Sequence, residues 1–471
     1  MAESMAGIHD RGVTTAPDTT APGGRLKPLV RLAIPVVVAR SGLMGMASVD
    51  LLMVGHYGAE ALAWVSLGSM AAGPLIGVLV GLLMGTMVST SLAIGEGRRT
   101  EAGAVWRRSV PYGLVLGAAM AAGCVFGPAL FLATGQPPDL AEGGGRVLAI
   151  LGVGLPGVAL YITSAFWLEA IGRPRSGMVL MIVGNLVNVP LNWVLVYGAL
   201  GVPEMGAEGS AWATTGMRWI MGLALLAMIW WLPGREALRV REKAGGRWRD
   251  WAAQRRQGFA AAVSIGAESI SFSILAMMAG WISIAAVGAY AIAINLQAVV
   301  FMVALGLASA TAVQVGTAWG ARDRAAASAA GWLGLALNSA VMGGLGLVMA
   351  LFPESLAGIF TGEPSVLPLA AAMIFIGAFA TVLDGGQTVM AHAVRGTGDT
   401  WVPSALQTVV YVGIMPAIAW GLAFGLERGA TGLMESIVLA SALALAGQAA
   451  RFAWLARRRA GPRAALPPAG G

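Results

Sequence analysis

Residues 87–102, MVSTSLAIGEGRRTEA, have a counterpart in the second half of the chain, within ASATAVQVGTAWGARDRAAA at residues 308–327. The two stretches align at a constant offset of 225, and the register holds through an apolar segment and the charged loop that follows it. At this offset Gly55 aligns with Gly280, Gly81 with Gly306, Thr86 with Thr311 and Gly95 with Gly320. If each half holds six apolar segments, both halves enter a bilayer from the same side. The pattern therefore predicts parallel repeats related by an axis along the membrane normal.

The composition is that of a membrane protein. The chain has 471 residues, of which 57% are hydrophobic and 11% charged, and its mean hydropathy is +0.75. Soluble domains carry about 25% charged residues, so a soluble enzyme is excluded. A nucleic-acid binder is excluded despite the net charge of +7, because a basic excess in a membrane protein marks cytoplasmic loops. The single Cys124 and three distant histidines provide neither a disulfide framework nor a Cys/His metal motif.

Twelve stretches are apolar and long enough to cross a bilayer, which takes about 20 residues. With Gly, Pro and charge clusters as boundaries, the sequence predicts an all-α polytopic membrane protein. We expect twelve transmembrane helices in two six-helix bundles related by pseudo-two-fold symmetry. The predicted spans are 29–54, 62–92, 109–133, 145–170, 177–199, 209–232, 257–281, 287–316, 328–352, 365–394, 403–425 and 430–455.

Loop charge predicts the orientation. With a cytoplasmic N-terminus, only Arg146 and Arg428 of the 30 Lys and Arg residues lie outside, and Arg40 and Arg218 lie within spans. We therefore expect both termini in the cytoplasm and the protein in a bacterial-type inner membrane, with its basic connector against anionic lipid. The predicted parts are a disordered tail, an N-terminal bundle, a basic cytoplasmic connector, a C-terminal bundle and a second tail, at residues 1–24, 25–232, 233–256, 257–455 and 456–471.

Three acidic residues fall inside predicted spans: Asp50 in the first, Glu268 in the seventh and Asp384 in the tenth. A charged side chain at mid-membrane costs about 2.5–3.5 kcal/mol, so each acid needs an explanation. A carboxylate that faces a cavity can bind a proton or a cation reversibly, as cation-coupled transport requires. The alternative is that each acid is neutralised by Arg40 or Arg218 in a buried pair.

Asn188 and Asn192 in the fifth span lie one turn apart and share a helix face. Between them, Pro190 frees a backbone carbonyl one turn back. The two amides could line a substrate cavity or form interhelical hydrogen bonds, and both interpretations stay open. For Glu169, at the end of the fourth span, the sequence predicts a pair with Arg173.

Glycine recurs every fourth residue along the second span, which predicts close approach of another helix rather than chemistry. The positions are Gly73, Gly77, Gly81 and Gly85. The sequence contains no P-loop, so ATP is not expected as the direct energy source. Duplicated bundles of this kind are an architecture of transporters, with the substrate between the halves.

Four segments together resemble the multidrug and toxic compound extrusion (MATE) family, and within it the NorM-like branch. They are the stretch from Pro35 through SVDLLMVGHYGAEALA (48–63), NVPLNWVLVYGALGVPEMGAEGSAWAT (188–214), SIGAESISF around Glu268, and the stretch from Asp384 through Asp399. The resemblance covers about residues 25–455. The second segment is the most distinctive of the four.

The resemblance implies two bundles around a central cavity that faces the two sides of the membrane in turn. It implies export of small amphipathic, often cationic compounds in exchange for Na+ or H+, by a monomer with neither a cofactor nor enzymatic activity. Asp50 matches the family's first-helix carboxylate, and Glu268 and Asp384 match a pair associated with cation binding, which makes them possible Na+ ligands. Asn188 and Asn192 match polar positions of the fifth helix.

Three positions depart from the family pattern. Ala289-Tyr290-Ala291 stands where members often have Ala-His-Gln, Ala380 stands where some have an aromatic residue, and Arg40 replaces a small or polar residue. These departures bear on substrate range more than on mechanism, because the carboxylates are intact. The alternative function is a flippase for lipid-linked saccharides of the same fold superfamily, which would need cationic residues such as Arg40 and Arg218 to hold a pyrophosphate.

Overall fold

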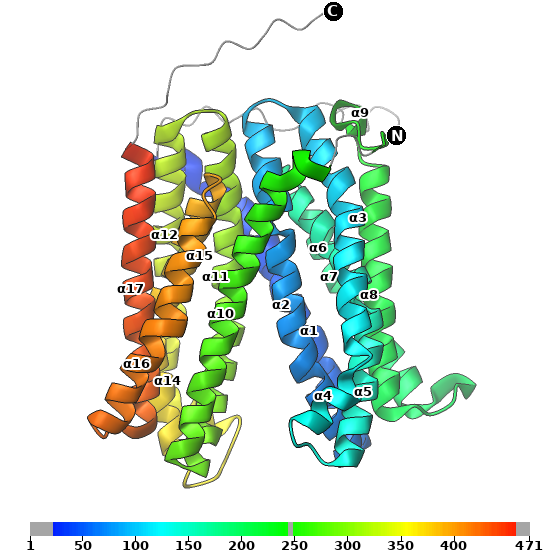
Figure 1. The fold of residues 1–471 in the computed structure, drawn as a ribbon, viewed down its shortest axis with the longest axis vertical. Coiled ribbons are helices and arrows are strands. Elements are labelled where there is room, and N and C mark those ends of the chain that lie inside the picture. Colours follow the sequence, from blue (N-terminus) through cyan, green and yellow to red (C-terminus); the bar gives the residue numbers. More distant parts are fainter. Residues whose placement is uncertain (1–21, 244–247, 458–471) are drawn as a thin grey trace, which may run out of the picture.

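The computed structural model describes residues 22–243 and 248–457. Every regular element in these ranges is helical, which confirms the predicted all-α class. The helices form two bundles that stand side by side (Figure 1). The bundles meet at the end where α1 begins and α17 ends, which we call the closed end, and diverge toward the other end (Figure 1).

The spans follow one another in the same order in both halves, although some are divided into different elements. The N-terminal bundle comprises α1 (Pro22–Tyr57), α2 (Ala59–Gly95), α3 (Arg99–Cys124), α4 (Gly127–Ala133), α5 (Pro138–Val153), α6 (Leu155–Ala170), α7 (Arg175–Tyr197), η2 (Ala199–Gly201) and α8 (Gly206–Trp230). Two short elements follow, α9 (Arg235–Leu238) and η3 (Trp248–Trp251). The C-terminal bundle comprises α10 (Ala252–Ile282), α11 (Ile284–Gly320), α12 (Arg324–Leu351), α13 (Pro353–Gly358), α14 (Leu367–Gly396), α15 (Trp401–Thr408), η4 (Val409–Ile414), α16 (Met415–Trp420), η5 (Gly421–Gly425) and α17 (Gly429–Arg457).

The number of spans agrees with the prediction once two bent segments are taken into account. Ten segments of the described chain are long and apolar enough to cross a membrane alone, and twelve spans result if each of two bent helix pairs is one span. The pair α3 and α4 bends by 53°, and the pair α5 and α6 bends by 41°. Pro128 and Pro156 lie in the first turns of α4 and α6, where proline starts a helix well but cannot continue the one before it.

The repeat detected in the sequence is a repeat of structure. Helices α2 and α11 have the same length, and their first and last residues are related by the offset found in the sequence, as are the first residues of α3 and α12. The turn between the two helices is also preserved, because the equivalent residues Gly97 and Arg322 both have left-handed backbone conformations, with φ of 76° and 62°. A non-glycine residue is uncommon there, so the fold keeps this turn even where its favoured residue is missing.

Pseudo-symmetric glycines bring the two bundles into contact. A Cβ atom on Gly95 would overlap the carbonyl oxygen of Thr317, and one on Gly320 would overlap that of Leu92. These two contacts are equivalent under the repeat offset, because Leu92 and Thr317 are themselves equivalent positions. Two further equivalent glycines, Gly81 and Gly306, also lie against backbone of the other bundle. The repeat thus builds a self-complementary interface in which backbone meets backbone.

The predicted glycine stripe on α2 packs against α10 of the other bundle. Gly77 lies against Ile265, and Gly85 against the backbone of Gln254, whereas a Cβ on Gly73 would meet nothing within 4 Å. The stripe is therefore a packing surface from Gly77 onward. Gly73 lies beyond its end.

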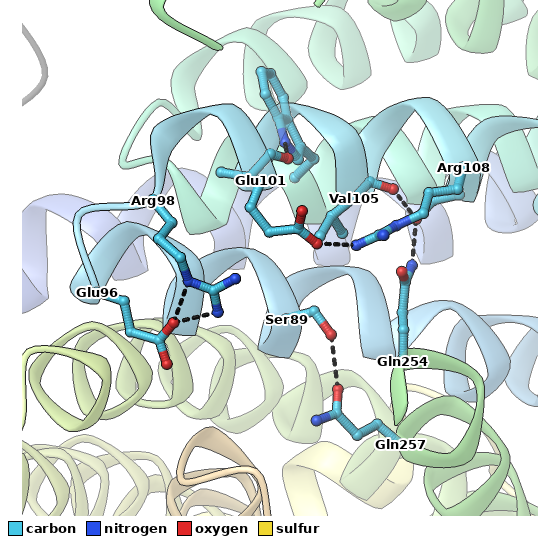
Figure 2. Close-up of polar contacts among 11 residues, drawn as sticks. Ser89, Glu96, Arg98, Glu101, Val105, Arg108, Gln254 and Gln257 are labelled. Carbon is cyan, nitrogen blue, oxygen red and sulfur yellow. Dashed lines mark hydrogen bonds and ion pairs between the residues drawn. The ribbon is translucent and has the colours of Figure 1, made fainter. Parts of the chain in front are cut away.

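Polar side chains add to this interface at the closed end. Figure 2 shows Ser89 of α2 donating a hydrogen bond to Gln257 of α10 over 3.0 Å, with Gln254 beside α3. The Gln254 Nε2 atom donates to Ser109 Oγ at 2.5 Å. These bonds join the first turns of α10 to α2 and α3, so the closed end combines glycine packing with hydrogen bonds between the bundles.

The predicted tails and connector coincide only partly with described residues. Residues 1–21, 244–247 and 458–471 lie outside the described ranges. Of the tails, residues 22–24 belong to α1 and residues 456–457 to α17. Within the predicted connector, 233–256, the structure has α9, η3 and the first turn of α10.

Candidate cation-binding site

The first cluster lies in the N-terminal bundle around Asp50 of α1. This side chain is buried, and its Oδ1 accepts hydrogen bonds from Nδ2 of Asn188 and of Asn192, each over 2.9 Å. Its Oδ2 accepts from the Thr214 hydroxyl at 2.5 Å. The structure thus brings together three residues singled out in the sequence and adds Thr214 from α8. Three donors on one carboxylate stabilise its ionised form in a buried position.

The two asparagines are oriented by this carboxylate. Because both amide nitrogens point at Asp50, both amide oxygens point elsewhere, and Oδ1 of Asn188 and of Asn192 has no hydrogen-bond partner among the described residues. Buried carbonyl oxygens without a partner are costly and are usually satisfied by water or a ligand. Both unpaired acceptors are buried in this conformation, so a cationic or hydrogen-bond-donating compound would reach them only after the helices rearrange.

Arg218 supplies the positive charge near this cluster. It lies one helical turn after Thr214 on α8, donates to the Leu151 carbonyl over 3.3 Å, and lies within electrostatic range of Asp50. It forms no direct ion pair with Asp50 within the described chain. Asp50 is thus partly neutralised, as the alternative interpretation predicts. The neutralisation comes from the electrostatic field of Arg218 and not from a direct ion pair.

The second cluster lies in the C-terminal bundle around Asp384, in the middle of α14. The carboxylate is buried, and its Oδ1 accepts from the Tyr411 hydroxyl at 2.8 Å and from Gln387 Nε2 at 3.2 Å. The Ser441 hydroxyl of α17 lies 3.2 Å from that of Tyr411. Tyr411 belongs to η4, a π-helical turn, and such widened turns are frequent at functional sites.

Glu268 of α10 belongs to the same cluster but is held differently. Its side chain is half-buried and, among the described residues, makes no hydrogen bond and no ion pair. It lies within electrostatic range of Asp384 and of the buried Arg395. Two carboxylates and one guanidinium carry a net charge of −1 when all three are ionised. The cluster can therefore accept one monovalent cation without gaining positive charge.

The residues present are compatible with Na+, which takes oxygen ligands. In the part of the chain that the structure describes, no three His, Cys, Asp or Glu side chains gather as a metal site. A Na+ ion beside Glu268 and Asp384 would thus take its further ligands from hydroxyl, amide or backbone oxygens. A proton would need only one of the two carboxylates.

Glu169 has a different partner from the predicted one. Its carboxylate pairs with Arg40 of α1 at 3.7 Å, and the guanidinium of Arg40 lies over the Phe166 ring, 4.8 Å from its centroid. Arg173 instead donates to the Pro233 carbonyl over 3.1 Å. The prediction of a Glu169–Arg173 pair is wrong, because Glu169 faces α1 in the buried interior whereas Arg173 lies beyond the helix end. Arg40 thus forms a structural ion pair with Glu169, and it is not the partner of Asp50, Glu268 or Asp384.

Sequence reasoning missed several residues of both clusters. Thr214 carries no signal by itself, because a hydroxyl in a membrane helix usually bonds its own backbone. Arg395 stands at the edge of the predicted tenth span, as a loop residue would, yet it is buried in the last turn of α14. The basic residue inside the Arg-Gly-Thr-Gly-Asp segment is the signal that could have found it.

Two duplicated helical bundles, each with a buried acidic cluster, define an integral membrane protein that carries ionisable groups inside the bilayer. The MatE family model matches residues 35–194 and 260–420, one segment in each bundle. The chain belongs to the MatE family of membrane transporters.

Relatives are similar to this chain over nearly its whole length. A probable multidrug resistance protein NorM of Caulobacter vibrioides is 37% identical over 431 residues, which are 91% of either chain. The multidrug resistance protein PmpM of Pseudomonas aeruginosa is 31% identical over 453 residues, 92% of either chain. The predicted NorM-like resemblance is thereby confirmed.

Solved structures share the fold at lower identity. One is described as an outward-facing conformation of a multidrug resistance MATE family transporter of the MOP superfamily. It superposes with a TM-score of 0.83 at 20% identity, over 92% of this chain and 97% of the other. The eukaryotic MATE transporter AtDTX14 gives 0.82 at 17% identity, over 92% and 98%. These likenesses confirm two bundles related by pseudo-two-fold symmetry.

Proposed function

We propose that this protein is a secondary multidrug efflux antiporter, which exports small amphipathic, often cationic compounds in exchange for Na+ or H+ by alternating access. It acts as a monomer in a bacterial-type inner membrane, with both termini in the cytoplasm, and neither a cofactor nor chemical turnover is needed. The relatives named as multidrug resistance proteins support the substrate class. With cytoplasmic termini, the closed end faces inward and the diverging end faces outward.

The observation that carries the proposal is the uncompensated acidic cluster of the C-terminal bundle. Glu268 and Asp384 together exceed the charge of Arg395 by one, and Glu268 has no hydrogen-bond donor among the described residues. An ionised carboxylate in a membrane is costly unless it is paired. The cluster is therefore stabilised by a bound monovalent cation, which is what an antiporter binds and releases in each cycle.

The cycle follows from competition between two cations. In the inward-facing state a lipophilic cation enters between the bundles, attracted by the acids and by the free amide oxygens of Asn188 and Asn192. After the bundles rearrange, Na+ or H+ from outside binds at Glu268 and Asp384 and displaces the compound. Linkage requires each ligand to weaken the binding of the other to the same degree.

The test uses purified protein in liposomes with ethidium as the probe. A Na+ gradient and a pH gradient are imposed separately, and dye movement is followed for the wild type and for Asp384→Asn. We expect one gradient to drive transport in the wild type, and at least about a tenfold loss of that rate in the variant, because the amide cannot balance a cation. Protein-free liposomes are the control. Gradient-driven transport by the variant at the wild-type rate would overturn the proposal.

The flippase alternative is less well supported, because the buried arginines are already engaged. Arg40 pairs with Glu169, and Arg218 lies in the field of Asp50 and donates to a backbone carbonyl. A pyrophosphate would need cations that are free to bind it. Movement of a fluorescent lipid-linked pyrophosphate, without any ethidium transport, would favour the flippase.

A further inference from the structure

A chain of hydrogen bonds links Arg395 to Asp384 by way of a second helix. Both residues belong to α14, but they lie three turns apart, about 16 Å along a helix, which is too far for direct contact. Arg395 Nη2 donates to Gln407 Oε1 of α15 over 2.7 Å, and Gln407 Nε2 donates to Gln387 Oε1 over 3.1 Å. Gln387 Nε2 then donates to Asp384 Oδ1 over 3.2 Å. We call these four residues the relay.

The direction of the relay is fixed by chemistry. A guanidinium has only donors, so Gln407 must present its oxygen to Arg395 and its nitrogen to Gln387. Gln387 must then present its oxygen to Gln407 and its nitrogen to Asp384. Reversal of either amide would set donor against donor or acceptor against acceptor, which is costly in a buried site. The arginine at one end therefore determines which group faces the carboxylate at the other.

The relay is well placed to hold its geometry. Arg395, Gln387 and Gln407 are all buried, so water does not compete for their hydrogen bonds. Arg395 is itself anchored by a second bond, from Nη2 to Ser264 Oγ of α10 over 2.7 Å. Ser264 lies one turn before Glu268, so this bond ties Arg395 to the helix that carries the second acid of the cluster.

We propose that Arg395 is a positioning residue for the coupling cation, which acts through Gln407 and Gln387 to fix the carboxylate of Asp384. Gln387 and the Tyr411 hydroxyl both donate to Oδ1, so neither engages Oδ2. The relay holds the first oxygen and thereby fixes the rotation of the carboxylate, which would present its second oxygen to a cation shared with Glu268. Without the relay only the Tyr411 hydroxyl holds the first oxygen, so the carboxylate rotates more freely, and ordering it reduces the affinity for the cation. This inference rests on the proposed function.

The test compares the two side-chain hydrogen bonds of Arg395, one to Gln407 and one to Ser264. Gln407→Met breaks the relay but keeps the length of the side chain and the arginine, and Ser264→Ala removes the other hydrogen bond of Arg395. Ethidium binding to purified protein in detergent is followed by fluorescence anisotropy. Bound dye is displaced with NaCl at pH 7.5, with choline chloride matching the ionic strength, and separately by lowering the pH. The measured quantity is the ion concentration that displaces half of the dye.

We expect Gln407→Met to raise that concentration about fivefold, the effect of one lost hydrogen bond, and Ser264→Ala to change it less than about twofold. Arg395→Lys, which keeps a donor and a charge, should retain most of the wild-type affinity for the displacing ion. Gln387→Met should match Gln407→Met, and the double variant should add little. An unchanged concentration in Gln407→Met, or an equal shift in Ser264→Ala, overturns the inference. If neither ion displaces ethidium from the wild type, the proposed function itself fails, and this inference fails with it.

Discussion

The two bundles share a fold and a repeat register, yet they treat their buried acids differently. Asp50 in the N-terminal bundle receives three hydrogen bonds and the field of Arg218. In the C-terminal bundle, two donors meet one oxygen of Asp384 and the Ser441 hydroxyl also lies beside its carboxylate, but Glu268 receives no hydrogen bond from the described residues. Duplication supplied the same framework twice. The N-terminal carboxylate has three donors and a positive charge nearby, whereas the C-terminal cluster has an unbalanced charge.

The comparison extends to the closed ends of α6 and α14. Glu169 and Arg395 lie at comparable places, each one residue before the end of its helix, although the repeat offset of 225 aligns Arg395 with Ala170. Glu169 is satisfied by Arg40 of α1, whereas Arg395 anchors to Ser264 of α10 and reaches Glu268 through its field. The two side chains carry opposite charges. The N-terminal half thus closes its charge balance locally, and the C-terminal half leaves a negative excess.

The largest effect is expected from a substitution in the C-terminal cluster. Glu268→Gln removes the unbalanced charge at nearly constant volume and costs no hydrogen bond, because Glu268 makes none within the described residues. We expect ion-driven ethidium efflux to fall about 100-fold, while the thermal unfolding midpoint in detergent changes little. Efflux in proteoliposomes and unfolding by tryptophan fluorescence measure the two quantities. Efflux at the wild-type rate would mean that Glu268 takes no part in coupling.

The next effect tests the N-terminal side. Asp50→Asn is the same acid-to-amide change, but it turns an amide toward three donors and removes the charge near Arg218. We expect a loss of about 2 kcal/mol in the free energy of unfolding, seen as a lower thermal midpoint. Glu268→Gln is the matched control. If the two variants unfold at the same temperature, the two clusters do not differ as described.

The smallest effect concerns what the bundles share. Gly95→Ala and Gly320→Ala each place a methyl group against the backbone of the other bundle, at equivalent positions. By symmetry we expect both to destabilise the closed end equally, by about 1–2 kcal/mol. Spin labels on Arg98→Cys and Arg322→Cys, in a Cys124→Ser background, report the distance across that end by double electron–electron resonance. Gly73→Ala, where a Cβ has open space, is the control. Opening by only one of the two glycine variants would show that the interface is not symmetric.

The sequence by itself determined the class of membrane protein, the internal repeat and the acidic residues inside the spans. Hydropathy and span length follow from the thickness of a bilayer, and the glycine register follows from backbone contact between the halves, so both leave a direct mark on composition. Asp50, Glu268 and Asp384 stood out because a charge in a membrane is too costly to be accidental. The bends at Pro128 and Pro156 were missed because hydropathy does not report the direction of a helix.

Only the tertiary structure decided the partner of each charge. Proximity along the chain predicts a partner for Glu169 in Arg173, yet Glu169 contacts Arg40 in a distant helix, because the fold brings the middle of α1 to the end of α6. Likewise Thr214 reaches Asp50, and Gln407 bridges Arg395 and Gln387, across separations that no periodicity records. Burial cost is a property of one residue and can be read along the chain. Charge balance depends on which residues are neighbours in space. It distinguishes the balanced cluster around Asp50 from the unbalanced cluster of Glu268 and Asp384.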